Sequence, residues 1–200
     1  MLALAARLRG SDSDFWNKKP PPNWTREEVA RLLKDSPWAK EIAPTYTSLP
    51  PPTDRRPWGE NPPIGWGSGP KPQRSVKASY QATIRWESAE PIRLAQKIAL
   101  PAAFNGYYVL GIVFQYATRG DLGSKPIENL QQSAVLLGTR AIDAEIVQVH
   151  PEMANEFLVG FPKTPPSGVQ RWEFSARVGL LALKAKFDTG DMLYHGQLAL

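Results

Sequence analysis

The chain has 200 residues with 42% hydrophobic and 22% charged side chains, and its formal net charge is +5. These values are ordinary for a globular protein, and we expect one core and a substantial extra segment. The sequence contains no cysteine, which excludes disulfides, thiolate chemistry and cysteine-ligated zinc or iron–sulfur sites. No apolar run approaches the roughly 20 residues that a membrane-spanning helix needs, so we expect no transmembrane span.

The positive charge is spread along the chain. Runs of Lys or Arg never exceed two residues, and the other basic positions are interleaved with acidic ones. A net positive charge permits association with anionic surfaces. The interleaved pattern, however, is typical of a solvated surface, and it predicts no nucleic-acid partner.

The prolines divide the chain into unlike regions. Thirteen of the 20 prolines lie between Pro20 and Pro72. We therefore predict a lead-in with a helical hook over residues 1–43, a proline- and tryptophan-rich arm or linker over 44–75, and a core domain over 76–200.

The first six residues, Met1–Ala6, are apolar and end in an Ala-x-Ala sequence. This pattern is typical of the end of an export signal next to its processing site, and we expect a truncated signal here. The alternative is the first turn of a helix that contains Leu2, Leu4 and Leu8.

A small helical hook is predicted before the arm. Thr25 and Glu28 form a capping box that begins a helix running to about Asp35. Ser36, followed by proline, favours a second short helical turn. Two aromatic residues of the lead-in are expected to dock on the rest of the protein: Phe15 and Trp16.

The arm contains few aliphatic residues, and its composition favours polyproline II and irregular loop. Two large aromatic side chains left in water would be unusual, so either they pack on the core or they bind a partner. In the second case the candidate contact residues are Trp58, Trp66, Arg55 and Arg56.

The most informative stretch lies in the middle of the chain. Apolar and polar residues alternate over Tyr80–Trp86, which predicts a strand with one buried face and a wet face that includes Arg85. Ser88 is expected to cap the helix that follows. The almost continuous apolar run Tyr107–Phe114 predicts a central strand. This order of elements allows a right-handed crossover between two parallel strands.

Further elements follow towards the C-terminus. Apolar spacing predicts a second helix over Ile127–Leu137, with Gly138 just beyond its end. Alternating patterns predict half-buried strands at Ile142–Ile146 and Phe157–Phe161. A terminal hairpin is predicted over Leu181–Leu200, so removal of the last residues should damage the sheet.

Together these elements predict an α+β fold. We expect a mixed β-sheet of about six strands with two helices on one face, preceded by the helical hook and the proline-rich arm. The sequence shows no internal repeat.

The sequence offers little evidence of catalysis. The two histidines, His150 and His195, have no nucleophile or third ligand associated with them, and we interpret both as surface residues. The glycine-rich segment 65–69 fits neither a nucleophile elbow nor a dinucleotide-binding loop, because Trp66 and Pro70 stand where glycine is required.

Two carboxylate pairs remain. Asp188 and Asp191 flank a predicted turn, and Asp143 and Glu145 share one face of a predicted strand. Either pair could bind a hard cation or serve as acid and base. Turn formation and a wet strand face explain them more simply, so we predict no catalytic residue, no cofactor and no metal ligand.

Several segments of the chain resemble a known family. They are Trp24–Glu28 (WTREE), Ser36–Ala39 (SPWA), Ile84–Ala89 (IRWESA) and Phe187–Met192 (FDTGDM). Together they resemble a family of uncharacterised bacterial proteins that are typically exported and begin with a signal sequence. The resemblance extends from about Phe15 to Leu200, and it implies export but no particular activity.

These observations favour a non-enzymatic extracytoplasmic binding or structural protein, periplasmic or secreted. Its partner would be an unknown protein or a component of the cell envelope. The alternatives are a hydrolase that uses Asp or Glu, with or without a divalent cation, and a cytoplasmic location.

Overall fold

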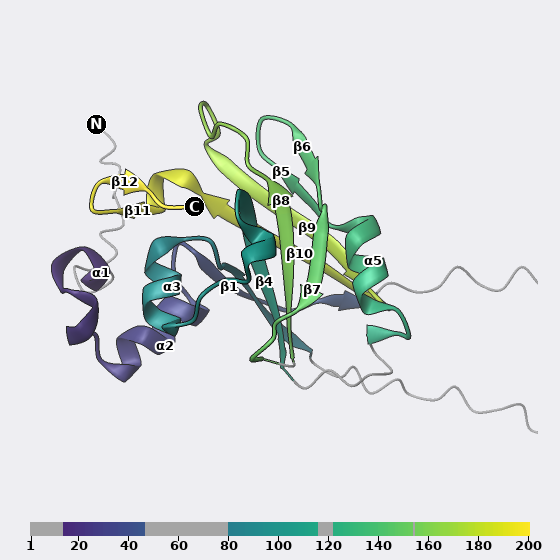
Figure 1. Ribbon diagram of the computed structural model, residues 1–200, viewed down its shortest axis with the longest axis horizontal. Coiled ribbons are helices and arrows are strands. Elements are labelled where there is room, and N and C mark those ends of the chain that lie inside the picture. The colour runs from purple at the N-terminus through teal and green to yellow at the C-terminus, as the bar shows by residue number, and fades with distance from the viewer. Residues whose placement is uncertain (1–13, 47–79, 116–121, 154) are drawn as a thin grey trace, which may run out of the picture.

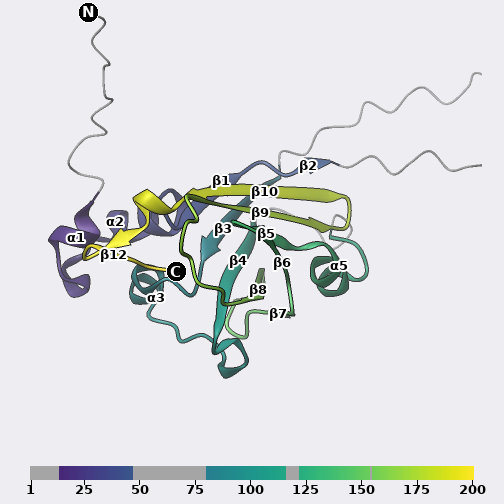
Figure 2. The ribbon, with the colours of Figure 1, turned by 90° about the horizontal axis from the view of Figure 1, so that it is seen from above.

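The computed structural model describes residues 14–46, 80–115, 122–153 and 155–200. Two five-stranded sheets pack face to face (Figure 2), and helices lie at both ends of the sheets (Figure 1). The helices of the described part are α1 (Phe15–Lys18), α2 (Arg26–Lys34), α3 (Glu90–Gln96) and α5 (Pro126–Ser133), with short 3-10 helices η1 (Pro21–Asn23), η2 (Ala102–Phe104) and η3 (Thr189–Asp191). The α+β class is confirmed.

The first sheet has the order β1 (Ala39–Ile42), β3 (Gln81–Trp86), β4 (Tyr107–Gln115), β8 (Glu156–Pro162) and β7 (Ile146–Val149). The second has the order β2 (Thr45–Tyr46), β10 (Leu181–Asp188), β9 (Arg171–Val178), β5 (Val135–Leu137) and β6 (Ala141–Asp143). Every pairing between the described strands is antiparallel. The structure thus has more strands than expected, in two sheets instead of one mixed sheet.

Two corners join the sheets. The consecutive strands β1 and β2 stand at matching positions in the two sheet orders, as do β6 and β7. The chain therefore passes from one sheet to the other at each of these edges. The predicted strand Ile142–Ile146 is one such corner, because β6 ends at Asp143 and β7 begins at Ile146.

The core lies between the two sheets, and β4 stands at the centre of the first sheet as predicted. Trp86 of β3 is fully buried there. Its ring centroid lies 5.6 Å from Tyr108, 6.0 Å from Trp172 and 5.9 Å from Phe187. These edge contacts join both sheets through aromatic side chains, which bury large apolar areas.

The strands β3 and β4 are antiparallel neighbours, so the parallel crossover that the sequence allowed does not form. Hydrogen bonds of Ser88 account for part of this antiparallel pairing. Its backbone N–H donates to Val109 O at 3.3 Å, and its Oγ accepts from Val109 N–H at 3.0 Å. Ser88 therefore extends the pairing of the two strands, and Ala89 takes the N-cap position of α3 without a side-chain cap.

The outer face of the first sheet is partly covered, so the predicted wet face of β3 is confirmed at the exposed Gln81 and wrong at the two residues that follow on that face. Thr83 and Arg85 are both buried. Phe104, from the connection between α3 and β4, packs on this face against Val109 and Leu158. Arg85 is removed from water by ion pairs with two carboxylates, which offset the cost of burying its charge.

The helix predicted over Ile127–Leu137 ends at Ser133. Ser133 Oγ accepts from Arg177 N–H of β9 at 2.8 Å, and the next residues pair with β9 and β6 as strand β5. Gly138 is not a helix cap. A Cβ there would lie 2.6 Å from the Trp172 ring, so glycine lets this ring approach the backbone.

The N-terminal segment packs on the core. The capping box of Thr25 and Glu28 is present at the start of α2, as predicted. Phe15 and Trp16 are buried, which confirms that they dock. A second turn does begin at Ser36, where Ala39 N–H donates to Ser36 O, but it is not helical, because Ser36 and Ala39 form a β-bridge at the entry to β1.

The predicted terminal hairpin is also wrong. The strand β10 pairs with β9, and the last residues form a separate two-stranded sheet of β11 (Leu193–Tyr194) and β12 (Gln197–Leu198). Figure 1 shows β11 and β12 beside α1, at the end of the molecule opposite α5. The last residues thus do not belong to the two large sheets.

Candidate functional site

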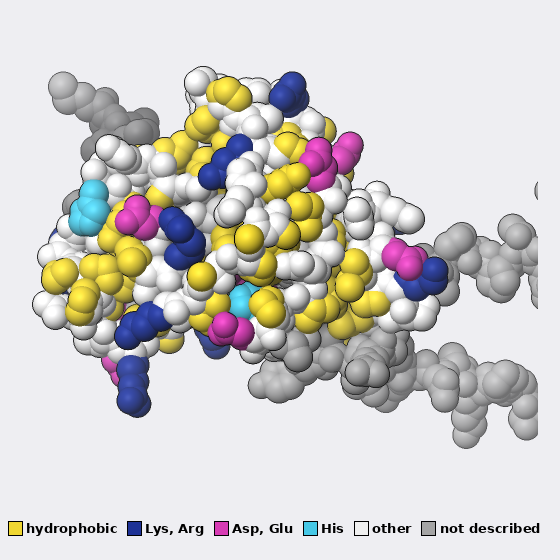
Figure 3. Space-filling model, viewed as in Figure 1, with side chains coloured by type: hydrophobic (Ala, Val, Ile, Leu, Met, Phe, Trp, Pro, Cys, Tyr) yellow, Lys and Arg dark blue, Asp and Glu magenta, His cyan; other side chains and the backbone are white. Residues whose placement is uncertain are grey.

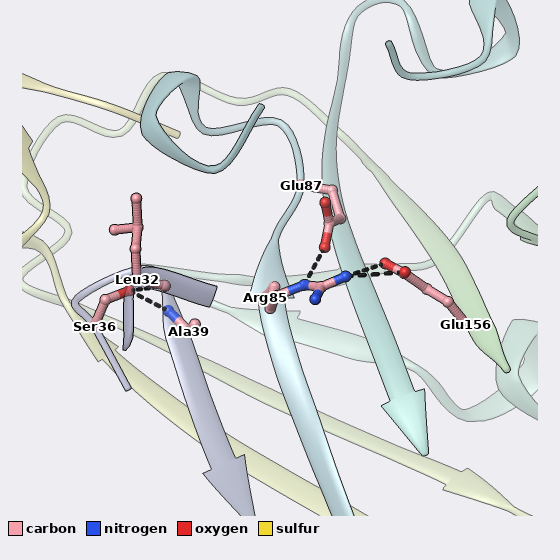
Figure 4. A network of polar contacts seen from close by, with 6 residues as sticks. All are labelled: Leu32, Ser36, Ala39, Arg85, Glu87 and Glu156. Carbon is pink, nitrogen blue, oxygen red and sulfur yellow. Dashed lines mark hydrogen bonds and ion pairs between the residues drawn. The ribbon is translucent and has the colours of Figure 1, made fainter. Parts of the chain in front are cut away.

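Three ionisable side chains meet on the outer face of the first sheet (Figure 4). Arg85 Nε donates to Glu87 Oε1 at 2.6 Å, and Arg85 Nη2 lies 2.9 Å from both Glu156 carboxyl oxygens. The exposed fractions of Arg85, Glu87 and Glu156 are 8%, 1% and 0%. A guanidinium is thus enclosed between two carboxyl groups by charge-assisted hydrogen bonds.

Gly111 of β4 makes room for this cluster. It lies opposite Arg85 on β3 and opposite Leu158 on β8. A Cβ at this position would lie 2.5 Å from Glu156 Oε1 and 2.6 Å from Glu87 Oε1. The two carboxyl groups therefore approach the same point above the glycine backbone.

The charges of the cluster do not balance when both carboxyl groups are ionised. Burial raises the pKa of Glu156 to about 7, and repulsion from Glu87 adds to this effect, while Arg85 opposes it. Burial alone would lower the pKa of Arg85, but the two carboxylates outweigh burial and raise it. The guanidinium therefore stays charged, and the cluster takes up a proton near neutral pH.

A carboxyl group that titrates near neutral pH is suited to general acid–base catalysis. Glu156, however, is fully buried, and both its oxygens are held by Arg85. A catalytic carboxyl must come within hydrogen-bond distance of its substrate. The geometry of this cluster is that of a buried structural ion network.

An open recess of about 470 Å³ lies beside α3 and the start of β4. Three basic side chains line it: Arg93 on α3, Lys97 at the end of α3, and Lys163 just after β8. The remaining lining is neutral and consists of Ser88, Ile98, Ala99, Leu100, Phe104, Asn105, Gly106 and Tyr107. The recess is therefore positively charged and has an apolar wall.

A smaller recess of about 200 Å³ lies between α3 and the C-terminal segment. It shares Ser88 and Arg93 with the larger one. It also contains an acidic residue, Glu90, and the buried Tyr194.

The structure separates the two histidines. His150 is buried, so its interpretation as a surface residue is wrong, and its Nδ1 accepts from Glu152 N–H at 3.1 Å. This contact closes the turn between β7 and β8. His195 is exposed, with a left-handed φ of 49°, and its N–H donates to Asn17 Oδ1 at 2.8 Å.

One residue of each candidate carboxylate pair is held by a neighbouring side chain. Asp188 accepts from Arg171 Nε at 2.6 Å on the sheet surface. Asp143 ends β6, whereas Glu145 lies in the corner before β7 and accepts from the Tyr107 hydroxyl at 3.0 Å. Across the described ranges no group of three or more His, Asp or Glu side chains converges as metal ligands would.

The candidate contact residues of the arm, Trp58, Trp66, Arg55 and Arg56, lie outside the described residues, as does the segment Met1–Ala6. Tyr46 and Tyr80 stand on either side of residues 47–79. Their rings are stacked with centroids 6.4 Å apart. The described chain therefore leaves and re-enters the sheets at one place.

Sequence reasoning missed both the ion cluster and the recess. Arg85 and Glu87 are two positions apart, which places them on one face of an extended segment, and this is the only local signal. Glu156 and Lys163 reach their positions through the pairing of β8 with β4. No spacing in the sequence indicates that pairing.

No protein-family model, curated protein or solved structure matches this chain. Among the described helices, none is both long enough and apolar enough to cross a membrane.

Proposed function

We propose that the protein is a non-enzymatic binding or structural protein that acts outside the cytoplasm. One observation supports this proposal above the others. Glu87 and Glu156 are enclosed, whereas no Asp, Glu or His of the described residues lines the open recess. The recess can hold a ligand, but its lining offers no general base at neutral pH.

The alternative is a hydrolase based on Glu156 and Glu87, and the near-neutral pKa of Glu156 is the observation that favours it. Such an enzyme would have to open the cluster to substrate. The proposal of a binding protein requires no such rearrangement.

A nucleic-acid partner is not part of the proposal. Basic side chains are dispersed over the face shown in Figure 3, with acidic and apolar side chains between them. Several basic side chains of the described residues pair with carboxylates: Lys19 with Glu28, Lys125 with Glu128, Arg171 with Asp188, and Lys186 with Glu173. Strong binding to a phosphate backbone needs a continuous basic surface.

The proposed location, periplasmic or secreted, is supported by the family resemblance of the sequence. A partner in the cell envelope, contacted through Trp58 and Trp66, belongs to the same proposal. Fractionation of the cells that produce the protein, followed by detection with an antibody, tests the location. Recovery of the native protein only in the cytoplasmic fraction would refute it.

A thermal-shift screen of the full chain tests binding against catalysis. A ligand that binds only the folded protein raises its melting temperature. Saturable stabilisation by small molecules, without turnover of ester or phosphodiester substrates, is the expected result. Turnover that is lost in Glu156→Gln would overturn the proposal and establish the hydrolase.

A further inference from the structure

The larger recess combines three cations from two separate parts of the chain. Arg93 and Lys97 come from α3 and its end, and Lys163 comes from the residue after β8. Lys97 has a left-handed backbone, with φ of 59°, which ends the helix and sets the direction of the following segment. The same segment then supplies the apolar wall, including Leu100 and Phe104.

Within the described ranges, these cations have no carboxylate as an ion-pair partner. Among the described residues, none of Arg93, Lys97 and Lys163 lies within 4.0 Å of an acidic oxygen as an ion pair. The Glu145 carboxylate, at the far end of the Tyr107 side chain, already accepts a hydrogen bond from Tyr107. Repulsion between neighbouring like charges is unfavourable, and an anion bound between them offsets part of it.

A structural explanation covers part of this cluster. Arg93 and Lys97 lie near the C-terminal carbonyls of α3, where positive charge is favourable. Lys163 belongs to another element, and its Nζ lies 5.7 Å from the Tyr108 ring centroid. The helix dipole therefore does not account for the third cation.

The neutral polar groups of the lining can also donate hydrogen bonds. Ser88 Oγ accepts from Val109 N–H, which leaves its O–H hydrogen for an acceptor in the recess. Asn105 contributes a side-chain amide to the lining. Cationic and neutral donors on one side thus face the apolar wall on the other.

We infer that this recess binds a small, doubly charged organic anion whose apolar substituent packs against Ile98 and Leu100, the two half-buried aliphatic residues of the wall. The charged group pairs with Arg93, Lys97 and Lys163, and the volume of about 470 Å³ is in the usual range for small-ligand sites. A phosphate monoester and a dicarboxylate share this chemistry. The inference rests on the proposed binding function and adds the class of ligand.

Isothermal titration calorimetry on the full chain, at constant ionic strength and about pH 8, tests the inference. Phenyl phosphate and phthalate are the two anionic probes, and phenol is the uncharged control. The recess variant is Lys97→Asn with Lys163→Gln, because Asn tolerates a left-handed backbone. The matched control is Lys184→Gln with Lys186→Gln, which removes the same charge from exposed positions on β10.

The expected result is saturable binding of one anion per chain, weakened about tenfold or more in the recess variant and unchanged in the control variant. The stronger of the two anions identifies the charged group. Equal weakening in both variants would show a non-specific charge effect and overturn the inference, as would equal binding of phenol. Circular dichroism checks that each variant is folded, and Arg93→Gln provides a second recess variant.

Failure of the inference is distinct from failure of the proposed function. If neither anion binds while other compounds raise the melting temperature in the screen, the binding function stands and the ligand class is wrong. If no compound stabilises the protein, small-molecule binding is wrong as well, and a structural role or a macromolecular partner is the part of the proposed function that stands.

Discussion

Glu156 is the residue at which folding and protonation are coupled most directly. Its pKa is raised from 4.5 to about 7 in the folded protein. Between these pH values the folded chain holds a proton that the unfolded chain has lost. The stabilisation is complete below pH 4.5, declines as the pH rises, and is lost above about pH 7.

We expect the free energy of unfolding to fall by on the order of 1 kcal/mol per pH unit across this window, relative to Glu156→Gln. Gln cannot ionise, and the variant keeps every other titrating group, so the difference between the two chains isolates this carboxyl. Urea denaturation at several pH values from about 4.5 to 8 measures it. If the free energy of unfolding changed with pH equally in the parent chain and in Glu156→Gln, the raised pKa of Glu156 would be refuted.

Gly111 is the second residue whose identity follows from the ion cluster. Gly111→Ala would place a Cβ 2.5 Å from Glu156 Oε1, and Arg85 holds that carboxyl in position. We expect a loss of about 1 to 3 kcal/mol in the free energy of unfolding. Gly190→Ala is the control, because no atom beyond its adjacent residues lies within 4 Å of its Cβ position. Equal losses of unfolding free energy in the two variants would show that the ion cluster rearranges around the new methyl group without a cost in stability.

At the scale of elements, Ser36 connects the end of α2 to the start of β1 through side-chain hydrogen bonds (Figure 4). Its Oγ donates to Leu32 O at 2.7 Å and accepts from Trp38 N–H at 3.2 Å and Ala39 N–H at 3.1 Å. Ser36 is buried. One hydroxyl therefore partners both the helix end and the strand entry.

Ser36→Ala should lower the free energy of unfolding by about 1 to 3 kcal/mol, because buried backbone groups lose their partner. The exposed neighbour Asp35→Ala should change it by less than about 0.5 kcal/mol. Chemical denaturation of both variants measures the difference. A Ser36 variant as stable as the Asp35 variant would contradict this role.

The elements that the sequence predicted well are those with local signals. The capping box of α2 lies within four residues, and the apolar run of β4 is continuous. The strand β5 was missed because Leu130, Ala134 and Leu137 fit one helical face. Its extended conformation depends on pairing with β9, a contact that no local pattern encodes. The recess was missed for the same reason.

At the scale of the molecule, the N-terminal and C-terminal segments hold each other. Asn17 beside β11 accepts from His195 N–H at 2.8 Å and donates from Nδ2 to Leu193 O at 3.3 Å. The rings of Trp16 and Trp38 lie 5.4 Å apart. Segments from both ends of the sequence thus close one end of the two-sheet core, as Figure 1 shows.

Trp38 connects the two terminal segments to the core. It is fully buried, and its Nε1–H donates to Ala199 O at 2.8 Å. Removal of residues 198–200 should therefore lower the free energy of unfolding by about 1 to 3 kcal/mol for the unpaired N–H, with a further loss from exposed apolar surface. Both large sheets should persist, because β12 pairs only with β11.

A double-mutant cycle with Trp38→Phe tests this closure, since Phe lacks the N–H donor. The truncation should cost less in the Phe background than in the parent, by about 0.5 to 1.5 kcal/mol, the usual net contribution of one hydrogen bond. Urea unfolding gives the four free energies, and far-ultraviolet circular dichroism reports the sheets. Additive effects would mean that the last residues stabilise the protein by packing alone. Loss of the β-sheet signal would mean that the large sheets depend on the terminal segment, as the sequence pattern first predicted.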